Sequence, residues 1–136
     1  MEFGKYEKYR ALILRIFLGF TVLFWGYEKI TLEKLVSGYT MDYGPFMLID
    51  VNLFLSITGW AQVLIGILLF LGLFTRLNAA IMVLMGLTTI IVPGLIVMKD
   101  VTHFAYAFAL TGAALALLIE GAGRYSLDRK LWSRQT

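Results

Sequence analysis

Two polar side chains in this sequence could serve an apolar ligand, namely Lys29 and His103. His103 can hydrogen-bond a carbonyl or carry a proton, because the unperturbed pKa of histidine is about 6.5. Trp25 and Trp60 are expected at a similar depth and offer aromatic surface. A site for a quinone ring needs an apolar slot with a few polar groups at the carbonyls. Trp25, Lys29, Trp60 and His103 therefore form a candidate ligand pocket.

Both polar residues also have simpler interpretations. A lysine beside Glu28 at a helix end can be a snorkelled interface anchor, and a histidine at the same boundary can have no chemical role. A single histidine and the absence of cysteine predict no metal site and no covalent cofactor, which leaves quinone as the candidate cofactor. No nucleophile and base pair, phosphate loop or paired carboxylate is recognisable, so an accessory role is favoured over a catalytic one.

The elements that would position these residues are membrane-spanning helices. The 25 residues from Val51 to Thr75 contain no charged side chain. As a helix they would extend about 37 Å, enough to cross a hydrocarbon core of about 30 Å. Hydrophobic residues make up 60% of the chain, only 15% are charged, and the mean hydropathy is +0.80. The pI of 9.3 does not indicate a nucleic-acid partner, because the basic residues flank apolar runs.

We predict an all-α membrane protein, a bundle of four transmembrane helices in one domain covering residues 1–136. The predicted helices are 11–30, 53–74, 77–98 and 103–119, followed by a short cytoplasmic helix over 126–134. Pro93-Gly94 should disturb the far end of the third helix. Gly112-Ala113-Ala114 predicts a close-packing face on the fourth.

The distribution of basic residues predicts the orientation. One side of the four helices carries nine lysines and arginines: Lys5, Lys8, Arg10, Arg15, Arg76, Arg124, Arg129, Lys130 and Arg134. The other side carries three: Lys29, Lys34 and Lys99. By the positive-inside rule both termini should be cytoplasmic.

Four further polar residues are interpreted as structural. Gln62 lies near the middle of the second helix, where its amide needs a partner from another helix. Arg15, near the start of the first helix, can return to the surface or bond within the bundle. Arg124 should form a cytoplasmic clamp with Asp128 or pair with Glu120, each four residues away. The hydroxyls of Thr88, Thr89 and Thr111 should bond to carbonyls of their own helices.

Four segments in order along the chain resemble the DoxX family: Arg15 with Gly19; Gly26-Tyr-Glu-Lys29; Gly66-Ile-Leu-Leu-Phe-Leu-Gly72-Leu-Phe-Thr-Arg76; and Gly121-Ala-Gly-Arg-Tyr-Ser-Leu-Asp-Arg-Lys-Leu131. The family comprises small four-helix membrane proteins, and its relatives include the membrane subunit of thiosulfate:quinone oxidoreductase. The resemblance implies a multi-pass protein of a prokaryotic cell membrane that associates with redox systems.

Two functions remain open from the sequence. The first is a subunit of a quinone-linked respiratory or oxidoreductase complex, either structural or contributing to a quinone pocket. The second is a stand-alone bundle that binds or moves a lipid or another small apolar molecule. The expected partners are membrane lipids together with other membrane subunits or further copies of the chain.

Overall fold

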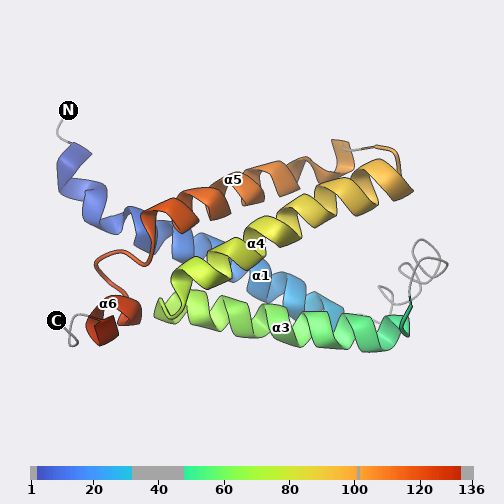
Figure 1. The fold of residues 1–136 in the computed structure, drawn as a ribbon, viewed down its shortest axis with the longest axis horizontal. Helices are drawn as coiled ribbons and strands as arrows, with labels where there is room; N and C mark the ends of the chain where they lie inside the picture. The colour runs from blue at the N-terminus through green and yellow to red at the C-terminus, as the bar shows by residue number, and fades with distance from the viewer. Residues whose placement is uncertain (1–2, 32–47, 101, 133–136) are drawn as a thin grey trace.

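The computed structural model describes residues 3–31, 48–100 and 102–132, and within these ranges every regular element is helical (Figure 1). The elements in chain order are η1 (Phe3–Tyr9), α1 (Arg10–Thr31), α3 (Val51–Leu71), α4 (Thr75–Thr89), η3 (Ile90–Val97), η4 (Thr102–Phe104), α5 (Ala105–Glu120) and α6 (Leu127–Trp132). The predicted all-α class is confirmed. The last part of the short helix predicted over 126–134 lies outside the described residues.

Three helical stretches are long and apolar enough to cross a membrane: Tyr6–Thr31, Val51–Leu71 and Thr75–Val97. The fourth apolar helix, α5, is shorter at 16 residues. Large apolar side chains such as Phe17, Phe24 and Leu64 point outward from these helices, as expected for surfaces that face lipid. The molecule is therefore an all-helical membrane protein.

Glycines bring α1 and α3 into close contact along their length. A Cβ added to Gly26 would lie 2.6 Å from the carbonyl oxygen of Gly59, and one added to Gly66 would lie 3.0 Å from that of Gly19. The spacing is seven residues on each helix, so both pairs fall on one face. Small residues of this kind allow close packing of membrane helices.

The second close pair is α4 with α5, where Gly86 packs against Thr111. The Thr111 hydroxyl donates to the carbonyl of Ala107 at 2.6 Å, while Thr88 and Thr89 donate to Leu84 and Met85, which confirms their predicted bonding. The close-packing face predicted around Gly112 needs correction. Ala114 is buried, but a Cβ on Gly112 would meet nothing within 4 Å.

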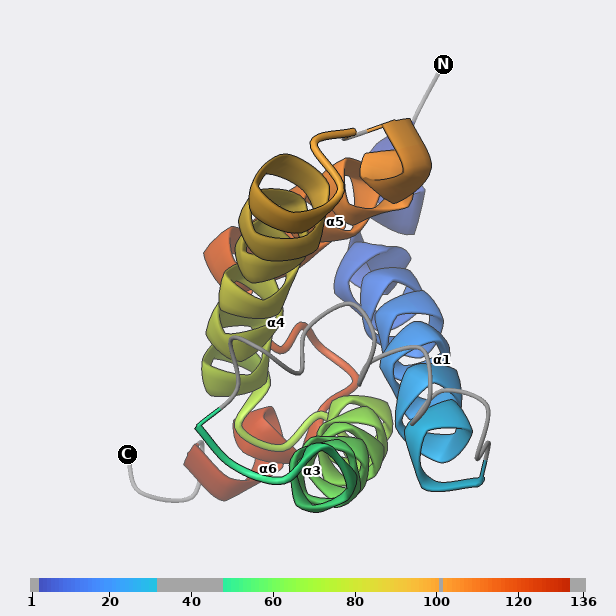
Figure 2. The ribbon, with the colours of Figure 1, turned by 90° about the vertical axis from the view of Figure 1, so that its right-hand side faces the viewer.

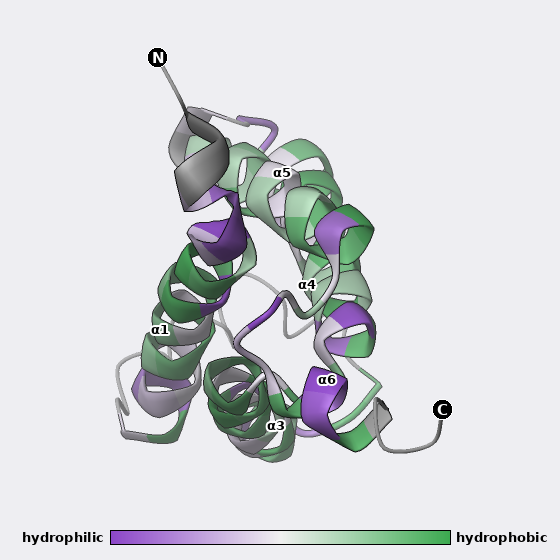
Figure 3. Ribbon diagram, turned by 90° about the vertical axis from the view of Figure 1, so that its left-hand side faces the viewer, coloured by the Kyte–Doolittle hydropathy of each residue, from purple (hydrophilic) through white to green (hydrophobic). Residues whose placement is uncertain are grey.

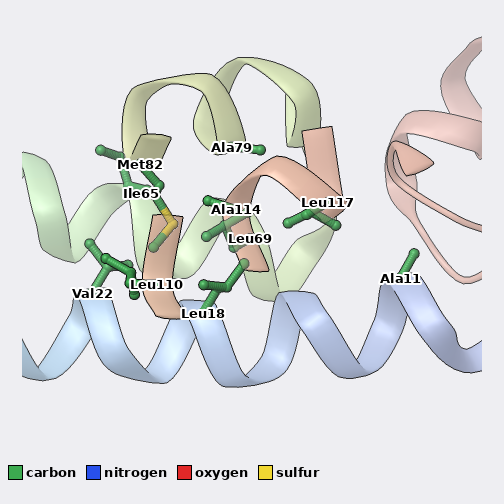
Figure 4. Close-up of a cluster of buried hydrophobic side chains, with 10 residues drawn as sticks. All are labelled: Ala11, Leu18, Val22, Ile65, Leu69, Ala79, Met82, Leu110, Ala114 and Leu117. Carbon is green, nitrogen blue, oxygen red and sulfur yellow. The ribbon is translucent and has the colours of Figure 1, made fainter. Parts of the chain in front are cut away.

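The helices α1, α3, α4 and α5 all contribute to one apolar core (Figure 4). Its buried members are Ala11, Leu18, Val22, Ile65, Leu69, Ala79, Met82, Leu110, Ala114 and Leu117. The core thus joins the α1 and α3 pair to the α4 and α5 pair.

Local signals set the ends of α3. The Asp50 carboxylate accepts from the Leu53 N–H at 3.1 Å and caps the first turn. Gly72 ends the helix in a left-handed conformation at φ 67°, with the N–H groups of Gly72 and Leu73 donating to the carbonyls of Leu69 and Leu68. The α3 helix therefore spans residues 51–71, whereas the predicted range was 53–74. The next helix, α4, begins at Thr75, two residues before its predicted start at residue 77.

The far third of the third span, Ile90–Val97, is π-helical around Pro93. Proline has no N–H and cannot continue the ordinary ladder. The Met98 N–H donates to the Pro93 carbonyl at 2.9 Å, a bond across five residues. The disturbance expected at Pro93-Gly94 therefore takes the form of a widened helical turn.

Candidate functional site

A cavity of about 560 Å³ lies between the helices, in the half of the bundle remote from the α3–α4 turn. The helices α3 and α4 leave that turn and separate, so that in the end-on view α1, α3, α4 and α5 surround a central region (Figure 2). The lining residues come from α1, α3, α4, η3, η4 and α5, and most are apolar. The cavity thus depends on the arrangement of α1, α3, α4 and α5.

Few polar groups line this cavity. Lys29 and Glu28 come from the end of α1, Gln62 from α3 and Tyr106 from α5. The hydroxyls of Thr58, Thr88 and Thr89 also line it, but each donates to a carbonyl of its own helix at 2.7–2.8 Å. Of the other four side chains, Glu28 and Tyr106 are exposed, so Lys29 and Gln62 are the more enclosed polar residues on the cavity wall.

Two members of the candidate ligand pocket line the cavity, namely Trp25 and Lys29. The Trp25 ring meets the Tyr106 ring edge-on at 5.5 Å between centroids, which makes α1 and α5 neighbours at this level. Trp60 is 62% exposed and does not line the cavity, because it follows the buried Gly59 and points to the outer surface of α3. The backbone of His103 lies in η4 beside the lining residue Phe104, but its side chain is outside the described part.

Tyr106 and Gln62 are polar lining residues that the sequence analysis did not assign to the pocket. In the helix predicted over 103–119, Tyr106 would share a face with His103, three residues before it, and this spacing could have indicated Tyr106. Gln62 was interpreted as a link between helices, yet its Oε1 has no hydrogen-bond partner although the residue is only 4% exposed. A polar residue at mid-helix signals a buried site without revealing whether the protein or a ligand provides the partner.

A second polar site, at the opposite end of the bundle, joins α1 and the α3–α4 turn to the segment that follows α5. Arg15 is 1% exposed and donates through Nη1 to the Ala122 carbonyl at 2.8 Å and through Nη2 to the Tyr125 carbonyl at 2.6 Å. The Asp128 carboxylate accepts from the N–H groups of Phe74 and Thr75 at 2.8 and 2.9 Å and so caps α4. We call these two side chains and the backbone groups they bind the terminal clamp.

The terminal clamp corrects the pairing predicted for Arg124. The side chain of Arg124 is exposed. Glu120, one of its two predicted partners, pairs instead with Arg10 at 3.4 Å. Gly121 and Gly123 have φ values of 80° and 73°, so the helical spacing that would place Arg124 beside Glu120 is lost at this point. Arg15, rather than Arg124, joins Asp128 in holding this end together.

Residues 10–99 match the model of the DoxX family. The chain belongs to the DoxX family. The match runs from the start of α1 to the end of the third span, so it includes most of the cavity lining of this DoxX protein. No curated protein and no solved structure matches the chain. Within the described residues of the DoxX chain, no group of three histidine, cysteine or acidic side chains is arranged to hold a metal ion.

Proposed function

We propose that this DoxX protein is a membrane subunit of a quinone-linked oxidoreductase and that its cavity receives the quinone ring. The observation that carries the proposal is the largely apolar cavity of about 560 Å³ with Lys29 and Gln62 on its wall. Ligand pockets commonly measure about 300–1,000 Å³ and combine apolar walls with a few polar groups. The chain then binds or positions the quinone, while partner subunits carry out the redox chemistry.

In the proposed topology, four helices cross a prokaryotic cell membrane and both termini are cytoplasmic. The terminal clamp supports it, because Arg15, Phe74 and Asp128 come from segments that would all lie on one side. Polar residues also gather at this end, around the start of α1 and on α6 (Figure 3). Together η4 and α5 run from 102 to 120, about 28 Å if helical throughout, which suits a fourth span. The cavity then opens toward the extracytoplasmic half.

One observation favours the second function, binding or movement of a lipid. A groove of about 460 Å³ lies between α1 and α5 with Leu14, Phe17 and Leu110 in its wall, and it adjoins the cavity at Trp25 and Tyr106. Such a groove fits an acyl chain. A stand-alone protein that holds a lipid would use this groove and the cavity together.

Purification in a mild detergent separates the two functions. The proposal predicts that redox subunits bearing haem, flavin or iron–sulfur centres co-purify with the chain and that extraction recovers quinone. A lone oligomer that retains phospholipid and no quinone would contradict it and support the second function.

Lys29→Met tests the role of the cavity within such a complex. The assembled complex should lose quinone occupancy or quinone-coupled turnover by about tenfold, which corresponds to the loss of one good polar contact. Lys99→Met is the matched control, since it removes a lysine that does not line the cavity. Equal behaviour of the two variants would argue against quinone binding in this cavity.

A further inference from the structure

The segment that follows α5 forms an open pocket at the end of the bundle that carries the terminal clamp. The pocket measures about 500 Å³. Its wall includes the cationic side chains of Arg124, Arg129 and Lys130, together with Leu71, the last residue of α3. We call it the basic pocket. Three cations on one wall favour an anionic ligand, because its charge offsets their mutual repulsion.

The acidic side chains at this end of the bundle are engaged outside the basic pocket. Glu7 and Glu120 lie 3.8 and 3.4 Å from Arg10. Both carboxylate oxygens of Asp128 accept from N–H groups of the α3–α4 turn. Within the described residues, neither arginine side chain of the pocket forms a hydrogen bond or an ion pair. Both guanidinium groups are therefore available to a ligand.

The basic pocket lies at a membrane boundary. The second apolar span ends at Leu71, so the pocket beside it is at the level where lipid headgroups follow the acyl chains. Helix α6 suits this interface as well. Its exposed residues Leu127 and Leu131 are four apart on one face, and basic residues lie between them in the sequence.

An exposed apolar stripe on α3 continues from the basic pocket along the second span. It consists of Leu71, Ile67, Leu64 and Trp60, which are 45–62% exposed. Their spacings of four, three and four residues place them on one face of the helix. A phospholipid with its phosphate in the pocket can lay an acyl chain along this stripe, whereas a soluble anion makes no use of apolar surface.

We propose that the basic pocket binds the headgroup of an anionic phospholipid, with its phosphate on Arg124 and Arg129 and an acyl chain on the α3 stripe. The planar guanidinium group matches phosphate oxygens and donates two hydrogen bonds to them at once. Basic pockets at the membrane surface are suited to anionic headgroups. The bound lipid joins α3 to the segment that follows α5, beside the terminal clamp.

Binding of two lipids to the purified full chain tests the proposal. Native mass spectrometry of the chain in detergent measures bound dilauroylphosphatidylglycerol and dilauroylphosphatidylcholine, which share their acyl chains and differ in headgroup charge. The wild type should bind the phosphatidylglycerol about tenfold more tightly, as expected for a charge-assisted contact. Arg129→Gln should lower this ratio to about three, and Arg124→Gln combined with Arg129→Gln should lower it to about one. Both arginines are exposed, so the variants should fold.

Arg76→Gln is the matched control. It removes an exposed arginine from the same end of the bundle, but one that does not line the basic pocket, so the tenfold preference should persist. Equal affinity for the two lipids in the wild type, a preference that survives the double substitution, or an equal loss in Arg76→Gln would overturn the proposal. Inorganic phosphate that binds as tightly as the phosphatidylglycerol would also overturn it, because the ligand would then be a soluble anion.

Discussion

At the scale of single residues, the half-buried Asp128 holds the turn between α3 and α4 to the segment that follows α5. Its two carboxylate oxygens accept from consecutive N–H groups, those of Phe74 and Thr75, at the start of α4. Phe74 has φ 50°, an unfavourable conformation for a residue with a side chain. The carboxylate compensates by binding N–H groups that the helix itself cannot satisfy.

Asp128→Ala should therefore destabilise the protein in detergent by about 1–2 kcal/mol, the usual effect of losing a helix cap. Arg124→Ala should change stability by less than about 0.5 kcal/mol, because its side chain is exposed. Thermal unfolding of the two purified variants measures the difference. Equal losses would show that the predicted Arg124 pairing, and not the observed cap, holds this end.

The cap also shows what a sequence does and does not reveal. Asp50 caps α3 from three residues away, and Gly72 ends the same helix, so both signals are local. The cap of α4 comes from a residue 54 positions away, and Arg15 binds carbonyls more than 100 positions away. Local patterns carry no information about such contacts, and this is why Arg124 was assigned the role of Arg15.

At the scale of elements, the contact between α1 and α3 depends on backbone approaching backbone. The carbonyl of Gly59 and the N–H of Val63 lie within 2.8 Å of where a side chain at Gly26 would begin. Neither group can move without displacing its helix. The hydrophobic pattern predicts each helix, but the partner of each glycine follows only from the register between the helices.

Gly26→Ala should thus cost about 1–3 kcal/mol, the range for overpacking a close contact. Gly112→Ala makes the opposite test, because its Cβ meets nothing and alanine favours the helix by up to about 1 kcal/mol over glycine. Detergent unfolding midpoints should move in opposite directions. A Gly26→Ala variant as stable as the wild type would mean that α1 and α3 are not in this register.

At the scale of the whole molecule, composition and the DoxX motifs were sufficient to predict an all-helical membrane protein. Trp25 and Lys29 were predicted to lie at a similar depth in the membrane and to line a pocket, and both line the cavity in the structure. Trp60 was grouped with them, although it faces outward, because depth in the membrane does not indicate which face of a helix points inward. The cavity itself results from the separation of α3 and α4, which no local pattern records.

Orientation of the bundle is tested by single cysteines, since the chain has none of its own. Asn52 and Arg124 are exposed and lie at opposite ends of the bundle. In intact cells an impermeant maleimide should label Asn52→Cys and should label Arg124→Cys only after lysis. The reverse pattern would invert the proposed topology.

The proposal that the cavity receives a quinone ring is tested most directly by filling the cavity with a large side chain. Ala61 on α3 and Ala116 on α5 are both exposed alanines, but only Ala61 lines the cavity. Ala61→Trp should weaken the binding of duroquinone to the protein in nanodiscs by at least about tenfold, while Ala116→Trp should bind it as the wild type does. Unchanged affinity in a folded Ala61→Trp variant would show that the ring does not bind between these helices.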